Sequence, residues 1–203
     1  MKTSILLALV IALFVQSSQA FQVIDSDPEN KLSRNPDYPA FGSGASSIRH
    51  YNLEASTIVP NQVITSTNEA IFNVTMGYGG KDDVRVKNIG DNIYALVAGI
   101  TQDATFSACY DGFAVYALDL TGNGVDEILV EHGRGQGTCV YERFLSIYDN
   151  LAGYGLQLRH RIKLSEWHMD QKLNRPVAWV KGYSINRDES GKVVIRLEPL
   201  GVD

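Results

Sequence analysis

A polar loop flanked by two short apolar runs does most to constrain how this chain can fold. The runs are Phe113–Leu118 and Ile128–Val130, and both are rich in aromatic and β-branched residues, as strands are. Their apolar residues follow one another without alternation, which is typical of strands that are covered on both faces. The stretch therefore predicts a hairpin at the centre of a β-sheet, with other parts of the protein packed on both sides.

The loop between these runs carries oxygen-bearing side chains at the spacing of a calcium loop. Asp119, Thr121 and Asn123 alternate with other residues, and Gly124 at the sixth loop position permits a tight bend. Such a loop can direct several oxygens at a hard cation. It is not an EF-hand, because that motif closes with a bidentate Glu at the twelfth position, where this chain has Val130. A plainer interpretation stays open, namely a Gly- and Asn-rich hairpin turn selected only for positive φ.

The segment from Phe113 to about Tyr141 resembles the FG-GAP (integrin-type) and VCBS repeat families, whose loops join two antiparallel strands as Asp-x-Asx-x-Asx-Gly-x-x-Asp. Those families usually have Asp or Asn where Thr121 stands and Asp where Glu127 stands, so the resemblance implies two direct carboxylates and a weak site. It also implies that Asp126 points outward. The chain has no second copy of the repeat, so we do not expect a full propeller. The implied calcium ligands are Asp119, Thr121, Asn123, the backbone carbonyl of Val125, and Glu127.

Met1–Ala20 has the pattern of a secretory signal peptide. Lys2 is followed by an apolar run and then by small and polar residues, and the run is too short to span a bilayer. We therefore expect a soluble, secreted or periplasmic protein that begins near Phe21 and has no membrane span. The formal net charge of −5 argues against nucleic acid and anionic lipid as partners.

The chain contains two cysteines, Cys109 and Cys139. In an oxidising compartment we expect them to form a disulfide. It would bracket the central hairpin and stabilise the protein by roughly 3–4 kcal/mol in the chain-entropy model. The alternative, two separate thiols with a redox role, lacks the CxxC spacing.

Two regions follow the signal peptide. Residues 21–60 contain four of the six prolines, and we expect an extended or poorly ordered arm that lies across the domain. Residues 61–203 are expected to form one mainly β domain with an antiparallel sheet, either sandwich-like or like a single propeller blade. The strand-like runs in its first half are Gln62–Thr65, Ala70–Met76, Val84–Lys87 and Ile93–Ala98.

A strict alternation of apolar and polar residues distinguishes Leu156–Leu164. This pattern predicts a strand with His160 facing inward and with Arg159, Arg161 and Lys163 on the outer face. The basic outer face could meet an acidic partner. It could equally be a solvated surface that blocks pairing at a sheet edge.

Three further segments have local patterns. Gly133–Gly137 is expected to be a glycine-rich turn, because it lacks the lysine and the following helix of a phosphate loop. Ser165–Asp170 is expected to be a short helical turn with Ser165 as its cap. Val177–Ile185 and Lys192–Leu200 are expected to form a terminal hairpin.

The chain has no catalytic motif of the GxSxG or HExxH type, and we predict no catalytic residue. Asp126, Glu131 and His132 lie close along the hairpin and are the nearest approach to an acid/base cluster. Alternation in a strand would, however, turn Glu131 and His132 to opposite faces.

We therefore predict a non-enzymatic binding or interaction protein whose partner is an unidentified protein or glycan. Two alternatives stay open. A secreted hydrolase would have a cleft in which Glu131, His132 or Glu166 meets a second titratable group. An inhibitor or immunity-type partner of another secreted protein would present a protruding loop such as Gly133–Thr138.

Overall fold

The computed structural model describes residues 21–34, 56–58, 62–65, 69–75, 81–91, 93–98, 101–108, 113–136, 140–151, 155–172 and 174–200. Within these ranges the chain forms strands and no helix, so no helix there could cross a membrane. The strands in chain order are β1 (Phe21–Asp25), β2 (Gln62–Thr65), β3 (Glu69–Thr75), β4 (Lys81–Gly90), β5 (Ile93–Ala98), β6 (Thr101–Ser107), β7 (Phe113–Leu118), β8 (Glu127–Gln136), β9 (Val140–Leu151), β10 (Gly155–Asp170), β11 (Arg175–Arg187) and β12 (Val193–Pro199).

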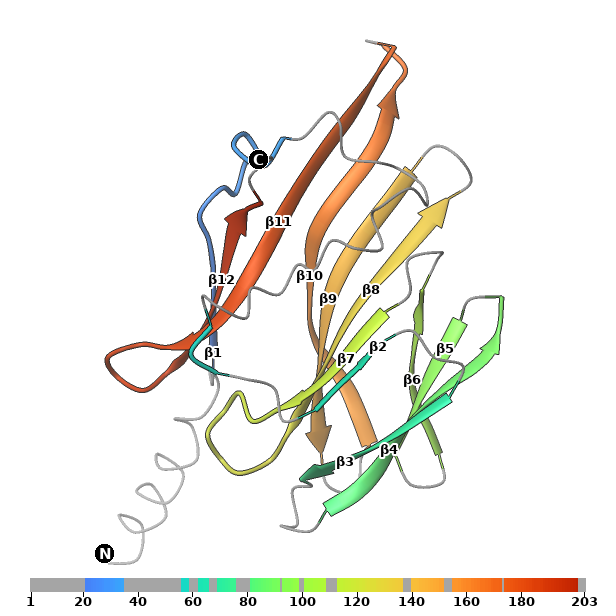
Figure 1. Cartoon of the computed structure of the whole chain (residues 1–203), viewed down its shortest axis with the longest axis vertical. Coiled ribbons are helices and arrows are strands. Elements are labelled where there is room, and N and C mark those ends of the chain that lie inside the picture. Colours follow the sequence, from blue (N-terminus) through green and yellow to red (C-terminus); the bar gives the residue numbers. More distant parts are fainter. Residues whose placement is uncertain are drawn as a thin grey trace, which may run out of the picture.

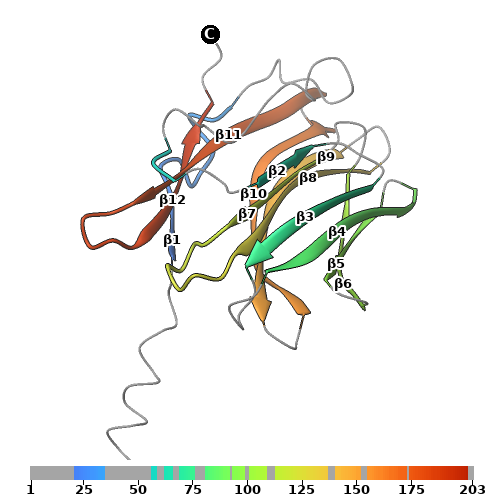
Figure 2. The same cartoon turned by 60° about the horizontal axis from the view of Figure 1, so that its bottom comes forward.

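These strands form two sheets (Figure 1). The large sheet has the order β1-β12-β11-β10-β9-β8-β7-β2, and the small sheet has the order β3-β4-β5-β6. Neighbouring strands are antiparallel except β1 and β12, which run parallel. The small sheet and the β11–β12 hairpin lie at opposite ends of the large sheet (Figure 2). The prediction of a mainly antiparallel, sandwich-like β fold that is not a full propeller is confirmed.

The first hydrophobic core lies between the two sheets. In β4, Val84 and Val86 are fully buried while Arg85 and Lys87 are exposed, so one face of the small sheet packs on the core and the other faces outward, as in a half-covered antiparallel sheet. The facing residues of this core include Val84, Val86, Leu96 and Phe106 of the small sheet and Val115, Ile128, Val130 and Tyr148 of the large sheet.

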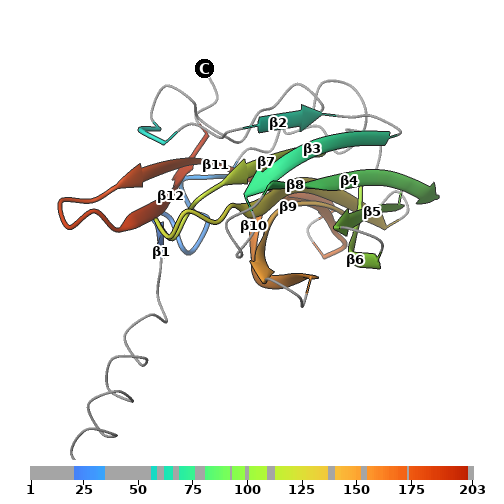
Figure 3. The ribbon, with the colours of Figure 1, turned by 90° about the horizontal axis from the view of Figure 1, so that it is seen from below.

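A second core covers the opposite face of the large sheet. Leu129, Leu145 and Leu164 come from its middle strands, whereas Tyr183 and Ile195 come from β11 and β12. Because all of these strands belong to one sheet, the sheet must curve around its long strand β10 (Figure 3). The strands β7 and β8 contribute to both cores, so the central hairpin is covered on both faces, as the sequence predicts.

Bulges interrupt the strict alternation predicted for β10. Its register against β9 shifts between Leu158 and His160, and a second shift follows Lys163. Each extra residue in a bulge turns the side chains that follow it to the other face. His160 lies opposite the buried Ile147, on the face of Ile162, but it is exposed, and its ring contacts that of Phe21 with the centroids 5.1 Å apart. The prediction that His160 faces inward into the core is wrong.

Two segments predicted as turns are parts of long strands. Ser165–Asp170 continues β10 and pairs with β11, a partner that local sequence does not reveal, so the helical turn is wrong. Gly133–Gln136 forms the end of β8, so the turn predicted there is also wrong. A Cβ placed on Gly133 would lie 2.6 Å from the hydroxyl oxygen of Tyr141. Glycine at this position thus lets the tyrosine lie across the strand.

The start of the N-terminal arm is bound to the large sheet. Phe21–Asp25 forms the edge strand β1. Further along, the carbonyl of Ser33 accepts a hydrogen bond from the amide of Val180 at 2.9 Å. The backbone of Arg34 forms an isolated antiparallel β-bridge with that of Trp179. The described part of the arm therefore follows the edge of the large sheet along β12 and β11.

Candidate metal centre

The loop between β7 and β8 is organised around the carboxylate of Asp119. Its Oδ1 accepts hydrogen bonds from the amides of Gly122 (2.7 Å) and Asn123 (3.2 Å), and its Oδ2 accepts one from Gly124 (2.9 Å). Gly122 and Gly124 have φ angles of 72° and 81°, in the left-handed region that glycine adopts without strain. The two glycines let the chain wrap around Asp119.

The other predicted ligands on this loop have different surroundings. The Oγ1 of Thr121 lies 3.5 Å from the Oδ1 of Asp119, so these two predicted ligand oxygens lie next to each other. The Oδ1 of Asn123 accepts a hydrogen bond from the amide of Val125 at 2.8 Å, as in an Asx turn. Asn123 would have to share this oxygen between the amide and a cation.

Glu127 lies where the loop rejoins the sheet, and only 4% of the residue is exposed. Its Oε2 accepts a hydrogen bond from the amide of Leu120 at 2.7 Å, so the side chain reaches back across the loop. Burial raises the pKa of Glu127 to about 7, and the charges of Asp119 and Asp149 act in the same direction. Asp149 is itself paired with Arg159 at 3.0 Å. The carboxylate of Asp119, on the same loop, is therefore the larger of the two charges that disfavour an ionised Glu127.

A hard cation fits the donor chemistry of the loop. Asp119 and Glu127 supply carboxylates, and Thr121, Asn123 and Val125 supply neutral oxygens, which are the ligand types that calcium prefers. Among the described residues, no group of three or more His, Cys, Asp or Glu side chains is placed to hold a metal ion. A calcium ion here would depend on two carboxylates and on neutral oxygens.

Asp126 is not an outward-pointing residue. Only 5% of it is exposed, and its Oδ2 accepts a hydrogen bond from the amide of Thr75 at 2.8 Å. The amide of Asp126 donates in return to the carbonyl of Thr75 at 3.0 Å. The expectation that Asp126 points outward is wrong, because the small sheet ends beside the loop and takes up this side chain.

The hairpin between β11 and β12 also reaches the loop. A Cβ on Gly122 would lie 3.7 Å from the Nη1 of Arg187, and the same Nη1 donates to the carbonyl of Gly191 at 3.1 Å. Arg187 thus adds a positive charge at the exposed rim of the loop. No local pattern identifies it, because the contact joins residues that are far apart in the chain.

Cys109 and Cys139 lie outside the described residues. The nearest described neighbours are Ala108, next to the end of β6, and Val140, at the start of β9. The disulfide therefore stays a prediction.

Glu131 and His132 face opposite sides of β8, as the sequence predicts. His132 points toward the small sheet, with its Nδ1 3.1 Å from the carbonyl of Ser107 and its Nε2 2.9 Å from the Oγ of Ser146. Glu131 lies in the other direction, 3.3 Å from an Nη of Arg143 and 3.4 Å from the hydroxyl of Tyr183. The two residues therefore do not form one acid/base cluster.

His132 is held as a neutral, buried side chain. Burial is the main cause that lowers its pKa to about 4, and the charge of Arg161 adds to it. Its partner Ser146 is completely buried and also accepts a hydrogen bond from the Nε of Arg161 at 3.2 Å. Both ring nitrogens and the serine hydroxyl are thus engaged inside the sandwich.

No protein-family model matches this chain, and neither a curated protein nor a solved structure is significantly similar to it.

Proposed function

We propose that this chain is a secreted or periplasmic, non-enzymatic binding protein whose β7–β8 loop takes one weakly bound calcium ion, as its resemblance to FG-GAP and VCBS repeats implies. The observation that carries this proposal is the buried Glu127 carboxylate, which reaches back across the loop to the amide of Leu120 and whose pKa the charge of Asp119 helps to raise. A divalent cation at this point would neutralise charge that is costly to bury.

The proposed ligands are Asp119, Thr121, Asn123, Glu127 and the carbonyl of Val125. Asp119 is already fixed by three backbone amides, so little ordering of the loop is needed to bind an ion. When bound, calcium would supply positive charge and link the end of β7 to the start of β8. With two carboxylates, the dissociation constant is expected on the order of 10⁻⁴–10⁻³ M, which suits a compartment with millimolar calcium.

Secretion agrees with the position of Phe21. This residue follows the predicted signal peptide directly and is the first residue of β1, where its side chain is buried in the second core. A cleavage before Phe21 would leave the described fold intact. The predicted disulfide suits the same oxidising compartment.

A specific observation favours an interaction role with a partner protein as the second candidate. The β10–β11 hairpin projects beyond the rest of the large sheet (Figure 1) and carries both tryptophans of the chain, Trp167 and Trp179. Both are half-buried, and Met169 nearby is 38% exposed. Tryptophan and methionine are enriched at protein interfaces. This hairpin takes the place of the protruding loop predicted at Gly133–Thr138, whose described part belongs to β8.

Calorimetric titration of calcium into chelator-treated protein tests the calcium loop. Saturable binding with a submillimolar to millimolar dissociation constant is expected, and Asp119→Asn should weaken it about tenfold or more because it removes a ligand charge. Asp188→Asn is the matched control. Asp188 also accepts amide hydrogen bonds in a tight turn, from Ser190 and Lys192, but lies outside the loop. Equal binding by all three proteins, or none, would overturn the proposal.

A further inference from the structure

Three cationic side chains surround the ring of Phe144. The Cζ of Arg134 lies 5.4 Å from the ring centroid, the Nζ of Lys163 lies 5.9 Å from it, and the Cζ of Arg161 lies 6.0 Å from it. We call Arg134, Arg161 and Lys163 the cationic cluster.

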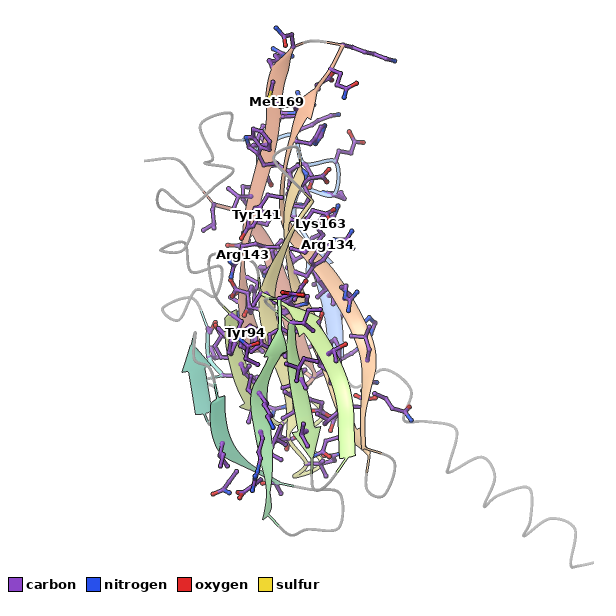
Figure 4. All side chains as sticks on the ribbon, turned by 90° about the vertical axis from the view of Figure 1, so that its right-hand side faces the viewer. Tyr94, Arg134, Tyr141, Arg143, Lys163 and Met169 are labelled. Carbon is purple, nitrogen blue, oxygen red and sulfur yellow. The ribbon has the colours of Figure 1, made fainter. Side chains whose placement is uncertain are left out.

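The cluster is assembled from three neighbouring strands. In the register of the large sheet, Arg134 of β8 lies opposite Glu142 of β9, while Lys163 and Arg161 of β10 lie opposite Phe144 and Ser146 of β9. Figure 4 shows Arg134 and Lys163 next to each other, with Tyr141 and Arg143 on the other side of the strands. All three cations therefore share one face of the sheet.

The positive groups of this cluster lie outside the negative ones. The side chain of Arg134 is 62% exposed and that of Lys163 is 34% exposed, whereas Glu142, which binds both of them, is 9% exposed. Lys163 also contacts Glu166 at 3.0 Å. Glu142 thus occupies the inner side of the cluster and holds two cations in place with their outer sides toward solvent.

Arg161 differs from the other two cations in its partners. Its Nε donates to the Oγ of Ser146 at 3.2 Å, and its charge acts to lower the pKa of the Tyr148 hydroxyl, which burial raises. Among the described residues, none of the hydrogen-bond or ion-pair partners of Arg161 is a carboxylate. Its positive charge is therefore not neutralised by a paired acid.

The charge balance of the cluster contrasts with that of the whole chain. The cluster sets three cations against Glu142 and Glu166, whereas the chain as a whole has a net charge of −5. The charges of Arg161 and Arg134 also help to lower the pKa of His132 and so to keep its ring neutral. The cluster is therefore positively charged within a chain whose net charge is negative.

We propose that the cationic cluster binds a carboxylate, sulfate or phosphate group, either free or carried by an acidic sugar. A guanidinium presents paired N–H donors that match the oxygens of such groups. Arg134 and Arg161 use Nε for their hydrogen bonds to Glu142 and Ser146, which leaves terminal N–H donors of both guanidinium groups for a ligand. Lys163 adds a third charge between them. The site deepens the proposed binding function by naming the class of ligand, but it uses none of the residues of the calcium loop.

Titration at constant ionic strength tests this proposal. Sodium sulfate, sodium phosphate and a uronic acid oligosaccharide are added to the full-length mature protein with chloride as the reference anion, and binding is followed by calorimetry and by the NMR signals of the arginine Nε–H groups. Saturable binding that moves the Arg134 and Arg161 signals is expected. A stronger response to the oligosaccharide would identify an acidic sugar as the source of the group, and an equal response would identify the free oxyanion. No saturable shift with any of the three would overturn the proposal.

Variants give the decisive comparison. Arg134→Gln and Arg161→Gln should each weaken binding about tenfold or more, because each removes a charged donor. Arg134 is largely exposed, so its variant keeps the test valid even if Arg161→Gln fails to fold. Arg159→Gln is the control on the same strand as Arg161, because Arg159 is paired with Asp149 at 3.0 Å. Equal affinity in Arg134→Gln and Arg159→Gln would contradict the proposal.

The proposal for the calcium loop and the proposal for the cationic cluster can be tested independently. Asp119→Asn and addition of a calcium chelator should leave anion binding unchanged, whereas Arg134→Gln should leave the calcium titration unchanged. Loss of anion binding in the Asp119 variant would show that the oxyanion depends on the loop and would overturn the site proposed here.

Discussion

Asp126 and Thr75 exchange two hydrogen bonds, one of 2.8 Å from the amide of Thr75 to the Asp126 carboxylate and one of 3.0 Å from the amide of Asp126 to the carbonyl of Thr75. They join the end of the β7–β8 loop to the last residue of β3 and hence the large sheet to the small one. We expect Asp126→Ala to lower the free energy of unfolding by about 2 kcal/mol, because it leaves a partly buried amide without its charged acceptor. Urea denaturation measures this change.

Asp126→Asn is the matched control, because an amide oxygen can still accept from Thr75. It should be destabilised by roughly half as much as the alanine variant. An alanine variant as stable as the wild type would mean that the two sheets do not depend on this contact.

Lys181 fastens the N-terminal arm to β11. Its Nζ lies 2.9 and 2.7 Å from the two carboxylate oxygens of Asp25 and 2.6 Å from the carbonyl of Asp27. We expect Lys181→Ala to lower the free energy of unfolding by about 2–4 kcal/mol, because it leaves Asp25 in a largely buried contact without its counter-charge. Lys31→Ala is the control, since Lys31 pairs with Glu29 at a well exposed position, and it should change stability by less than about 0.5 kcal/mol. Equal stability of both variants would contradict a structural role for the buried pair.

His132 should make the protein less stable in acid. Its pKa is lowered from an ordinary value of 6.5 to about 4 in the folded state, so between these pH values the unfolded chain binds a proton that the folded chain does not. Stability should therefore fall as the pH is lowered from 6.5 toward 4, by up to about 1.4 kcal/mol per pH unit. The ring signals of His132 in NMR spectra should not titrate above about pH 5.

The contribution of His132 must be measured as a difference. Glu127 has a raised pKa of about 7, so its contribution to stability runs in the opposite sense and is lost as the pH rises from 4.5 to 7. The two slopes partly cancel in the wild type. Comparing the wild type with His132→Gln at each pH isolates the histidine, and an unchanged slope in that variant would contradict the assignment.

Local pattern predicts the central hairpin, strands at Val84–Lys87 and Ile93–Ala98, and the division between Glu131 and His132, because these depend on the period of a strand and on neighbours in sequence. It also places Asp119 and Glu127 at the two ends of one loop. Such features need no knowledge of distant partners.

Features that depend on distant strands are not predictable in the same way. The bulges of β10 follow from its pairing with β9 and place Leu156 and Ile162 in different cores, and the burial of Asp126 follows from the position of β3. β6 is also missed, because Thr101–Ser107 has few apolar residues and is held by pairing with β5. Arg161 and Lys163 belong to the basic face predicted for β10, but the sequence does not reveal that Arg134 joins them, since Arg134 meets Lys163 only through Glu142 on the strand between them.

The disulfide prediction concerns Cys109 and Cys139. We expect oxidised protein to contain no free thiol by a reagent assay under denaturing conditions, and reduction to lower the melting temperature by several degrees, because the closed loop limits the unfolded chain. Cys109→Ser combined with Cys139→Ser should melt at the temperature of the reduced wild type. Two reactive thiols in non-reduced protein would contradict the pairing.

Calcium should raise the melting temperature of the folded protein. At about ten times the dissociation constant, an ion that binds only the folded state stabilises it by RT ln 11, roughly 1.4 kcal/mol, which corresponds to a shift of a few degrees. Magnesium should do less, because it demands tighter octahedral geometry and the loop offers mainly neutral oxygens beside its two carboxylates. Asp119→Asn should abolish the shift, since it removes the charge at the first loop position.

A variant of Asp126 is the second protein to compare in this experiment. The Asp126 carboxylate is bound to Thr75, so Asp126→Asn should lower the melting temperature without calcium while it keeps most of the calcium-dependent increase. Stability and ion binding would then separate between two acidic residues of one hairpin. If saturating calcium moves neither the melting temperature nor the amide signals of residues 119–127, the loop is a Gly- and Asn-rich turn and the calcium proposal is wrong.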